Sequence, residues 1–595
     1  MGLAARLRRE ARFAVGLLRT LARVATIRAG SKTLICDDLE RAVDRWRDRA
    51  AISLDGEGFS YGELDAAANR YAHWARAQRL ARGEIVAVVL ANRLDYLAIW
   101  YGLAKVGVVA ALINDELVGA TLAHCLEASR AAHCILDART RPRFDAVRPS
   151  LASPMVRWML EAADGGEEDL AAALSRLSPS RPPRSLRAGM TARDTALLIF
   201  TSGTTGLPKA ARVTHLRAQL YMRGFAGATG ARPDDRLYLA LPLYHATGGL
   251  CAMGAALLNG ASVALRRDFS AHRFWADVTA ERATLFVYIG ELCRYLVNQR
   301  PGPAEAAHSL RLAFGNGLAP DVWTALERRF RIPRILEFYG STEGNVSMFN
   351  FDGTPGAIGR APRFLRALFN VALVRFDLDR EAPLRIANGL CMRPALGETG
   401  ECVGKIGAGA RSAYAGYVDA KASEAKVLRD VFRRGDRWFR TGDLMRQDAE
   451  GYFYFVDRIG DTFRWKGQNV STTEVSQVLL EAPGVLEATV YGVAVAGHDG
   501  RAGMAALVVG PEFDLRNLAS RIDTVLPSYA QPVFLRLMPR INTTGTFKHR
   551  KAELVAAGFD PAKVAPPLYF RDAAAGYVAL TPALHASILA PGARI

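Results

Sequence analysis

Residues 200–212 carry the residue types and spacing best suited to chemistry in this chain, the binding of a phosphate chain. They read Phe-Thr-Ser-Gly-Thr-Thr-Gly-Leu-Pro-Lys-Ala-Ala-Arg and overlap an apolar segment, 196–200, that is typical of a buried strand. Glycine lets backbone N–H groups approach an anion closely, and threonine and serine hydroxyls add donors. Lys209 adds a compact positive charge. The leading hypothesis is therefore a nucleotide-dependent enzyme.

The spacing of this loop excludes two common nucleotide-binding motifs. A P-loop ends in Gly-Lys followed by Ser or Thr, whereas Gly206 is followed by Leu-Pro-Lys. Two Gly-x-Gly segments, 315–317 and 407–409, lack the third glycine of a dinucleotide-binding fingerprint. Taken by itself, the loop could also be a polar surface turn.

The segment 201–209 resembles the signature loop of the adenylate-forming superfamily, which includes the acyl-CoA synthetases. Its ending, Leu-Pro-Lys-Ala-Ala, is similar to that of fatty acid transport proteins and very-long-chain acyl-CoA synthetases. Further motifs follow in the order of that family between residues 40 and 570. The resemblance implies an α/β fold with a large multi-subdomain N-terminal adenylation domain and a small, mobile α+β C-terminal domain.

The resemblance also implies which residues bind the nucleotide. In the segment 339–345, Glu343 matches a residue that contributes to Mg²⁺ binding and Thr342 one that contacts the nucleotide. A single carboxylate beside phosphates and water is also how proteins usually hold Mg²⁺. The turn 315–320 matches the adenine-binding turn, Asp443 the carboxylate that binds the ribose hydroxyls, and Arg458 a nucleotide-contacting arginine. The full nucleotide set is Thr201, Ser202, Gly203, Thr204, Thr205, Gly206, Lys209, Gly315, Asn316, Gly317, Tyr339, Asp443 and Arg458.

The run 457–475 closely resembles the signature of fatty acid transport proteins at the domain junction. The superfamily usually has a lysine followed by an acidic residue at the hinge. This chain has Gly460 followed by Asp461, and either residue is a candidate pivot. Lys466 and Gly467 match the region that meets coenzyme A after the domain rotates.

The segment 542–551 resembles the motif that carries the catalytic lysine. The common form places the lysine directly after a glycine, whereas here Thr546 and Phe547 intervene, as in the transport-protein branch. We assign the catalytic role to Lys548, with Lys551 as the second candidate. A solvated basic face is the alternative for this cluster. Glu343 and Thr342 complete the expected catalytic set.

The segment 244–249 aligns with an aromatic and histidine motif that borders the acyl pocket of the family. Tyr244, His245 and Gly248 are its candidate substrate-binding residues. His245 could position the acyl carboxylate or gate the acyl tunnel. A histidine in an apolar run is equally consistent with a core residue.

The charge and the cysteine content of the chain limit the molecules that it can bind and the compartment that it occupies. The net charge is +18, which suits the phosphates of ATP and coenzyme A or anionic lipid headgroups. No nucleic-acid-binding motif is present in the sequence, so we expect no nucleic acid partner. The seven cysteines are scattered without a C-x-x-C pair, which indicates a reducing compartment without a structural metal or a disulfide framework.

The first thirty residues predict an amphipathic helix. Apolar residues recur at helical spacing, and three arginines share another face: Phe13, Leu17, Leu21 and Val24 against Arg12, Arg19 and Arg23. Such a helix could lie on an anionic membrane or dock on the protein's own surface. The apolar segment 237–265 is long enough to span a bilayer, but Pro242 and paired glycines favour a strand, a loop and a buried helix.

These features together place four parts along the chain. We expect a basic N-terminal helix, an AMP-binding domain, a C-terminal lid domain and a tail, over residues 1–30, 31–459, 460–580 and 581–595. The expected activity is ATP-dependent synthesis of long-chain or very-long-chain fatty acyl-CoA through acyl-AMP, with ATP, Mg²⁺ and coenzyme A, and it could be coupled to uptake. The alternatives are a fatty acid transport or binding protein with weak ligase activity and an acyl-AMP ligase that serves a carrier protein.

The expected location is cytoplasmic and membrane-associated, at the inner face of a bacterial plasma membrane. The sequence leaves open the chain length of the acid, a sterol or bile-acid side chain in its place, peripheral or integral attachment, and the oligomeric state, with a homodimer among the options.

Overall fold

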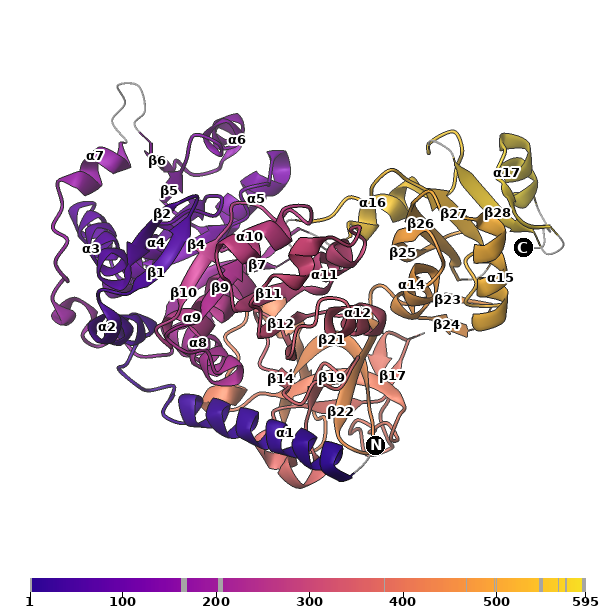
Figure 1. The fold of residues 1–595 in the computed structure, drawn as a ribbon, viewed down its shortest axis with the longest axis horizontal. Helices are drawn as coiled ribbons and strands as arrows, with labels where there is room; N and C mark the ends of the chain where they lie inside the picture. Colours follow the sequence, from indigo (N-terminus) through magenta and orange to yellow (C-terminus); the bar gives the residue numbers. More distant parts are fainter. Residues whose placement is uncertain are drawn as a thin grey trace. The chain divides into compact units, whose positions relative to one another are not determined.

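The chain divides into two compact units, whose helices and strands are labelled in Figure 1. The computed structural model describes residues 3–161, 169–201, 207–378, 380–466, 468–496, 498, 500–544, 549–564, 567–572 and 575–590. Unit 1 consists of Met1–Val371, Gly404–Arg429 and Gly435–Phe439, and unit 2 of Ala372–Val403, Asp430–Arg434 and Arg440–Ile595. The domain boundary that the sequence places after residue 459 stays a prediction.

Unit 1 contains an eight-stranded sheet in the order β14-β13-β12-β11-β9-β10-β1-β2. The inner strands are parallel, and the edge pairs β1–β2 and β13–β14 are antiparallel. Most inner strands are apolar on both faces, as a parallel sheet covered by helices requires. The bounds are β1 Ala50–Leu54, β2 Glu57–Ser60, β9 Arg236–Leu239, β10 Ser262–Leu265, β11 Leu285–Ile289, β12 Leu312–Asn316, β13 Ile335–Gly340 and β14 Ser347–Asn350.

A six-stranded sheet of unit 1, in the order β6-β5-β3-β4-β7-β8, carries the predicted phosphate loop. Its last two strands form an antiparallel pair, in which Thr201 at the end of β7 lies opposite Lys209 at the start of β8. The predicted strand before the loop is therefore confirmed, and a second strand follows it directly. The bounds are β3 Ile85–Val89, β4 Val109–Ile113, β5 His133–Leu136, β6 Val156–Met159, β7 Thr195–Thr201 and β8 Lys209–Thr214.

Helices surround these two sheets. Their bounds are α1 Leu3–Val24, α2 Ile35–Trp46, α3 Tyr61–Ala77, α4 Tyr96–Lys105, α5 Gly119–Ser129, α6 Arg141–Val147, α7 Leu170–Ser175, α8 His215–Thr229, α9 Met253–Leu257, α10 Phe274–Ala280, α11 Gly290–Val297, α12 Pro320–Arg328 and α13 Ala420–Glu424. Short 3₁₀ segments are η1 Arg148–Ser150, η2 Arg184–Arg187, η4 Pro303–Ala306, η5 Arg363–Leu368 and η6 Ala410–Ser412, and η3 Thr247–Ala252 is a π-helix.

The apolar segment 237–265 folds as the sequence predicts. It forms most of β9, a loop, η3, α9 and β10, all packed within unit 1. Gly248 lies in η3, where a Cβ atom would overlap the carbonyl oxygen of Pro242. In the part of the chain that the structure describes, no helix combines the length and the apolar character needed to cross a bilayer.

The further strands, β15 to β24, form antiparallel pairs or lie beside them. Within unit 2, β16 pairs with β19, β17 with β18, β21 with β22 and β23 with β24, all antiparallel. Within unit 1, β20 pairs with the start of β21. The bounds are β15 Gly359–Arg360, β16 Ala372–Val374, β17 Phe376–Asp377, β18 Ala382–Pro383, β19 Thr399–Lys405, β20 Val427–Arg429, β21 Arg437–Gln447, β22 Tyr452–Arg458, β23 Phe463–Trp465 and β24 Gln468–Val470.

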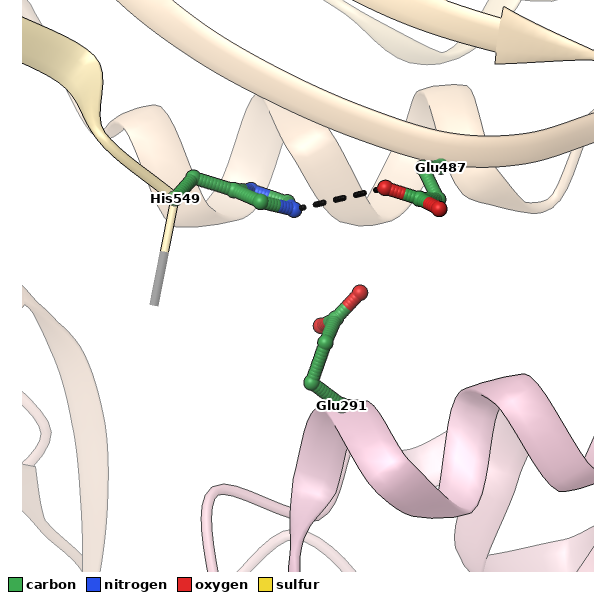
Figure 2. Close-up of side chains that lie close together, drawn as sticks. All are labelled: Glu291, Glu487 and His549. Atoms are coloured by element: carbon green, nitrogen blue, oxygen red, sulfur yellow. Dashed lines mark ion pairs between the residues drawn. The ribbon is translucent and has the colours of Figure 1, made fainter. Parts of the chain in front are cut away.

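The C-terminal part of unit 2 is a five-stranded sheet in the order β25-β26-β27-β28-β29, with only β26 and β27 parallel. The segment that leads into α16 lies against this sheet, where His549 Nε2 is 3.8 Å from a carboxylate oxygen of Glu487 on β25 (Figure 2). The bounds are β25 Val485–Val493, β26 Ala502–Val509, β27 Phe534–Leu537, β28 Leu568–Asp572, β29 Gly576–Ala579, α14 Thr472–Leu480, α15 Leu515–Val525, α16 Lys551–Ala557 and α17 Pro582–Ile588.

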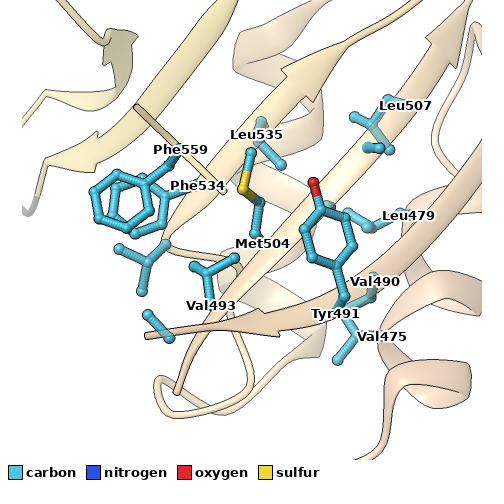
Figure 3. Close-up of a cluster of buried hydrophobic side chains, with 14 of the residues drawn as sticks. Val475, Leu479, Val490, Tyr491, Val493, Met504, Leu507, Phe534, Leu535 and Phe559 are labelled. Carbon is cyan, nitrogen blue, oxygen red and sulfur yellow. The ribbon is translucent and has the colours of Figure 1, made fainter. Parts of the chain in front are cut away.

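The core of this part lies where the sheet meets its helices (Figure 3). Val475 and Leu479 come from α14, and Met504 comes from β26. The rings of Phe534 and Phe559 stack with centroids 4.1 Å apart. This part of unit 2 therefore has an apolar core of its own. The predicted lid domain over residues 460–580 stays a prediction.

The predicted N-terminal helix is confirmed as α1, which packs on α8 (Figure 1). The apolar face that carries Phe13, Leu17, Leu21 and Val24 packs on the protein itself. The expectation that this face contacts a membrane is therefore wrong. Phe13 is 4% exposed and contacts the ring of Phe351 edge-on, and Thr20 is 9% exposed. The reason is close packing: a Cβ atom on Gly227 of α8 would lie 2.7 Å from the Thr20 Cα.

We predict that Gly227→Ala displaces α1, because the new methyl group meets backbone atoms that have no flexible end to move. Overpacking of this kind costs about 1–3 kcal/mol. Amide hydrogen exchange should become faster over residues 13–24, and chemical denaturation should show the lower stability.

Gly224→Ala on the same helix is the matched control, because nothing lies within 4 Å of its Cβ position. Replacing a helical glycine there should leave stability unchanged or raise it by up to about 1 kcal/mol. Equal behaviour of the two variants would contradict the proposed close contact.

Candidate functional site

Tyr417 gathers three of the predicted nucleotide-binding residues in unit 1. Its backbone forms a bridge with Ala211 of β8, beside the predicted phosphate loop. Its hydroxyl donates to Glu343 Oε1 at 2.9 Å, and Lys209 Nζ lies 6.0 Å from the centre of its ring. Burial raises the pKa of Tyr417, the Glu343 carboxylate raises it further, and a hydrogen bond with Thr201 opposes the shift. Thr201, Lys209 and Glu343 therefore surround one phenol.

Sequence reasoning missed Tyr417. It lies 74 positions from Glu343 along the chain and belongs to none of the motifs. The only local signal is an aromatic residue after Gly416, which has a positive φ of 68°. That signal marks a turn and does not mark a site.

The segment that carries Glu343 is held in place by α8. Arg217 Nη2 and the Tyr221 hydroxyl both donate to the carbonyl oxygen of Ser341, at 2.8 and 2.6 Å. Burial raises the pKa of Tyr221 to about 12, so it stays protonated as a donor. Asn345 donates to the carbonyl oxygen of Lys405 at 2.9 Å. The loop between β13 and β14 is thus fixed at both of its ends.

A small cavity of about 40 Å³ lies beside this segment. It is lined by Tyr339, Thr342 and His245, and by aromatic and small residues from α8, η3 and the neighbouring strands. A volume of this size holds a water molecule or two and no acyl chain. His245 therefore lines the same cavity as two of the predicted nucleotide-binding residues, Tyr339 and Thr342. Among the described residues that line the cavity, Tyr244 and Gly248 do not occur.

The predicted adenine turn lies at the end of β12. Gly315 and Asn316 close the strand, and Gly317 has a positive φ of 82°, which favours glycine. Leu318 donates its backbone N–H to the buried carboxylate of Glu337 at 3.0 Å. Sequence reasoning missed Glu337, although a carboxylate within the apolar run 335–338 is a signal of a buried polar group.

In unit 2, the predicted ribose and nucleotide contacts face each other. Asp443 on β21 is the register partner of Arg458 on β22, and Arg458 Nε lies 3.4 Å from Asp443 Oδ1. The backbone N–H of Asp443 donates to Thr441 Oγ1 at 3.1 Å. Both side chains are therefore oriented by the strand pair before a ligand binds.

The predicted hinge acid has a partner in the same unit. Lys551 Nζ lies 3.2 Å from Asp461 Oδ2 and 2.8 Å from the Thr472 hydroxyl. The second candidate for the catalytic lysine thus already has a local role. Asp457 lies next to Lys551, Asp461 and Thr472, and burial raises the pKa of its carboxyl. Lys466 has a positive φ of 50° in the turn between β23 and β24.

Several predicted residues lie outside the described part of the chain. They are Ser202, Gly203, Thr204, Thr205, Gly206, Gly467 and Lys548. The segment 549–551 directly follows Lys548, and its first residue is His549, which faces Glu487 (Figure 2).

Two family models match the chain. The model described as "AMP-binding enzyme" matches residues 39–373, and the model described as "AMP-binding enzyme C-terminal domain" matches residues 474–548. Long-chain fatty acid transport protein 6 of the mouse is 39% identical over 555 residues, which cover 92% of this chain and 89% of that protein. Long-chain fatty acid transport protein 3 of humans is 44% identical over 529 residues, which cover 87% of this chain and 76% of that protein.

Solved structures show the same fold. An anthranilate CoA ligase in complex with anthranoyl-AMP has a TM-score of 0.76 at 20% identity, over 90% of this chain and 98% of that one. A fatty acyl CoA synthetase of Mycobacterium tuberculosis has a TM-score of 0.62 at 24% identity, over 88% of this chain and 98% of that one. These matches confirm the predicted α/β fold with a large N-terminal and a small C-terminal domain.

We predict that Tyr417→Phe weakens the binding of Mg·ATP about tenfold, because one hydrogen bond to a charged group is lost. Equilibrium titration with a non-hydrolysable ATP analogue and Mg²⁺ measures the effect.

Tyr414→Phe is the control, because the Tyr414 hydroxyl donates to the backbone oxygen of Ser423 at 3.1 Å and not to Glu343. An unchanged affinity in Tyr417→Phe, or an equal loss in both variants, would show that Tyr417 does not orient Glu343.

Proposed function

The chain belongs to the AMP-binding enzyme family and to its long-chain fatty acid transport protein branch, and we propose that it is an ATP-dependent ligase that joins a long-chain or very-long-chain fatty acid to coenzyme A. The observation that carries the proposal is the group around Tyr417, because it brings the predicted phosphate and magnesium residues together. The names of the relatives and of the structural neighbours support the two substrates, an acid and coenzyme A.

The proposed reaction has two steps. A carboxylate oxygen of the fatty acid attacks the α-phosphorus of ATP, the bond to pyrophosphate breaks, and acyl-AMP forms. The thiolate of coenzyme A then attacks the acyl carbon, and AMP leaves with the electron pair of the broken bond between the acyl carbon and the phosphate oxygen of the mixed anhydride. Each step needs charge stabilisation at the transferring group, which fixed cations and N–H groups provide.

The side chains divide this work between them. The segment from Thr201 to Lys209 would hold the triphosphate. Gly315, Asn316, Gly317 and Tyr339 would hold the adenine. Asp443 and Arg458 would bind the ribose and the adjacent phosphate of ATP. His245 lies at the cavity where the acyl carboxylate would enter.

The donor set around Tyr417 fits a magnesium ion. Glu343 offers a hard carboxylate oxygen, held by the Tyr417 hydroxyl, beside the strand pair that carries Thr201 and Lys209. Glu343 would hold Mg²⁺ together with phosphate oxygens, and the ion would neutralise charge on the triphosphate.

The second step would require the C-terminal domain, residues 460–580, to turn and to exchange Lys548 for the surface around Lys466 and Gly467. Asp461 is tied to Lys551 of α16 and so moves with the domain core. This favours Gly460 as the pivot, since a residue without Cβ absorbs a change of φ and ψ at little cost.

A long acyl chain would need more room than the cavity of about 40 Å³ provides. The aromatic side chains of Tyr221, Phe225 and Phe349 line it. We propose that they move aside when the acid binds, and that their packing sets the chain length. A carrier protein in place of coenzyme A is the alternative acceptor, and transport without ligation is the alternative function.

The proposal also includes contact with an anionic membrane. Helix α1 has a second apolar face, opposite its docked face, on which Leu3, Leu7, Val15 and Leu18 are 75%, 61%, 53% and 65% exposed. Exposed arginines such as Arg8 and Arg12 lie beside this face. Apolar side chains flanked by cations fit a lipid surface with anionic headgroups. The inner face of a bacterial plasma membrane stays the proposed location.

We expect pyrophosphate release only when ATP and a fatty acid are both present, and acyl-CoA when coenzyme A is added. A panel of acids from medium to very long chain length identifies the substrate. Turnover with a phosphopantetheinylated carrier protein but not with coenzyme A would support the alternative acceptor. No pyrophosphate release with any acid would refute the ligase.

Lys548→Ala should lower fatty-acid-dependent exchange between ATP and pyrophosphate about 100-fold or more, since it removes a cation from the transferring group. Thioester formation from supplied acyl-AMP should change far less. Lys551→Ala is the comparison variant, and it should lower stability through the lost contacts with Asp461 and Thr472. Full exchange in Lys548→Ala, with loss in Lys551→Ala, would reassign the catalytic lysine.

The double variant Leu7→Glu with Leu18→Glu should bind vesicles containing phosphatidylglycerol at least about tenfold more weakly, because two apolar side chains no longer enter the lipid. Both residues are exposed, so the melting temperature should stay the same. Leu396→Glu, at a leucine that is 53% exposed in unit 2, is the control. Equal vesicle binding by all three proteins in a flotation assay would rule out this surface.

A further inference from the structure

Three adjacent parallel strands of unit 1 carry one row of residues in register. Tyr288 on β11 lies opposite Gly315 on β12, and Gly315 lies opposite Glu337 on β13. The Tyr288 hydroxyl donates to Glu337 Oε2 at 2.5 Å, so the bond crosses over the middle strand. A Cβ atom on Gly315 would lie 2.6 Å from Cε2 of the Tyr288 ring. The glycine therefore makes the hydrogen bond between the outer strands possible.

The second oxygen of Glu337 holds the turn that follows β12. Glu337 Oε1 accepts the backbone N–H of Leu318 at 3.0 Å, and the N–H of Gly317 also stabilises the carboxylate. On its other side the turn lies against the start of α11, where a Cβ atom on Gly290 would overlap the carbonyl oxygen of Gly317. The turn backbone is thus confined between Gly290 and one buried carboxylate.

Strand β13 links this turn to the cavity. Residues two apart on a strand point to the same face, so Glu337 and Tyr339 share one side of β13. Tyr339 lines the cavity, whereas Glu337 contacts the turn. A shift of Glu337 would therefore move both the turn and the strand that carries Tyr339.

The carboxyl of Glu337 titrates in the neutral range. It is 2% exposed, and burial raises its pKa to about 7 against the opposing hydrogen bonds from Tyr288 and the turn. The titratable groups that interact electrostatically with Glu337 are Tyr288 on β11 and Cys293 on α11. Burial holds the pKa of each of them well above its usual value. Both stay neutral near pH 7, so Glu337 is the member of this cluster whose charge changes there.

We propose that Glu337 is a positioning residue for the nucleotide, which fixes the backbone of residues 315–318 in the place where adenine binds. The inference rests on the proposed function, since it assumes that this turn meets ATP. Glu337 acts through the turn and does not touch the reacting atoms.

The first test compares three variants, Glu337→Ala, Glu337→Gln and Tyr288→Phe, by the dissociation constant of ATP and by steady-state kinetics. Glu337→Ala should raise KM and the dissociation constant for ATP about tenfold, because the turn loses its acceptor. The KM values for the fatty acid and coenzyme A should stay within about twofold. Glu337→Gln keeps a neutral oxygen acceptor for Leu318, as the protonated carboxyl does, and should recover part of the affinity above a pH of about 7. Tyr288→Phe should fall between the two.

The second test uses pH. In the wild type, the KM for ATP should rise as the pH falls through about 7, because the neutral carboxyl is a weaker acceptor than the carboxylate. In Glu337→Gln this dependence should flatten. Protonation of ATP itself affects both proteins equally, so the difference between the two profiles isolates Glu337.

A stability measurement gives a readout independent of activity. The pKa of Glu337 is raised from 4.5 to about 7 on folding, so the folded protein binds the proton more tightly than the unfolded chain does. Its contribution is complete below pH 4.5 and is lost as the pH rises through about 7. The melting temperature of the wild type should therefore fall relative to that of Glu337→Gln over this range.

The outcomes separate the two proposals. A wild type that binds ATP but forms no acyl-adenylate would contradict the ligase, while the ATP titration would still test Glu337. Identical pH profiles of wild type and Glu337→Gln, or equal KM increases for all three substrates in Glu337→Ala, would overturn the positioning role. If Glu337→Ala does not fold, Glu337→Gln and Tyr288→Phe decide the question.

Discussion

The hydrogen bond from Tyr417 to Glu343 is the contact on which the candidate site depends. Tyr417 is bridged to β8 in the six-stranded sheet, and Glu343 follows β13 in the eight-stranded sheet. One phenol thus couples the strand pair that ends at Thr201 and Lys209 to the loop that carries the predicted magnesium ligand. This contact places the Glu343 carboxylate beside the strands that carry Thr201 and Lys209, and the bonds from α8 to Ser341 hold the same loop.

Buried charge follows one rule throughout the site. Each carboxylate that is removed from water has donors that compensate for its desolvation, since an unpaired buried charge is costly. Asp443 faces Arg458, and Glu337 accepts from Tyr288 and from the turn backbone. The same bonds that make burial tolerable also hold the proposed ligand-binding groups in fixed orientations, so preorganisation and stability have the same physical origin.

Local sequence patterns predicted the helices and strands better than they predicted which face of each one is buried. The apolar run before Thr201 and the periodicity of residues 1–30 identified β7 and α1, because each pattern reports burial within one element. They did not show which side of α1 docks. Phe13 and Leu18 are similarly apolar, yet one is buried against Phe351 and the other is exposed. Only the neighbouring residues distinguish them: the ring of Phe351 covers Phe13, and α8 approaches the same side of α1 at Gly227.

By itself the sequence determined the residue types of the site, the motifs that carry Lys209, Glu343 and Asp443, and the family. The tertiary structure alone decided that Tyr417 joins the phosphate strands to Glu343, and that Glu337 reaches across Gly315 to Tyr288. The physical reason is that these bonds join residues far apart in the chain. Strand register and helix packing set such distances, and no local pattern of residues encodes them.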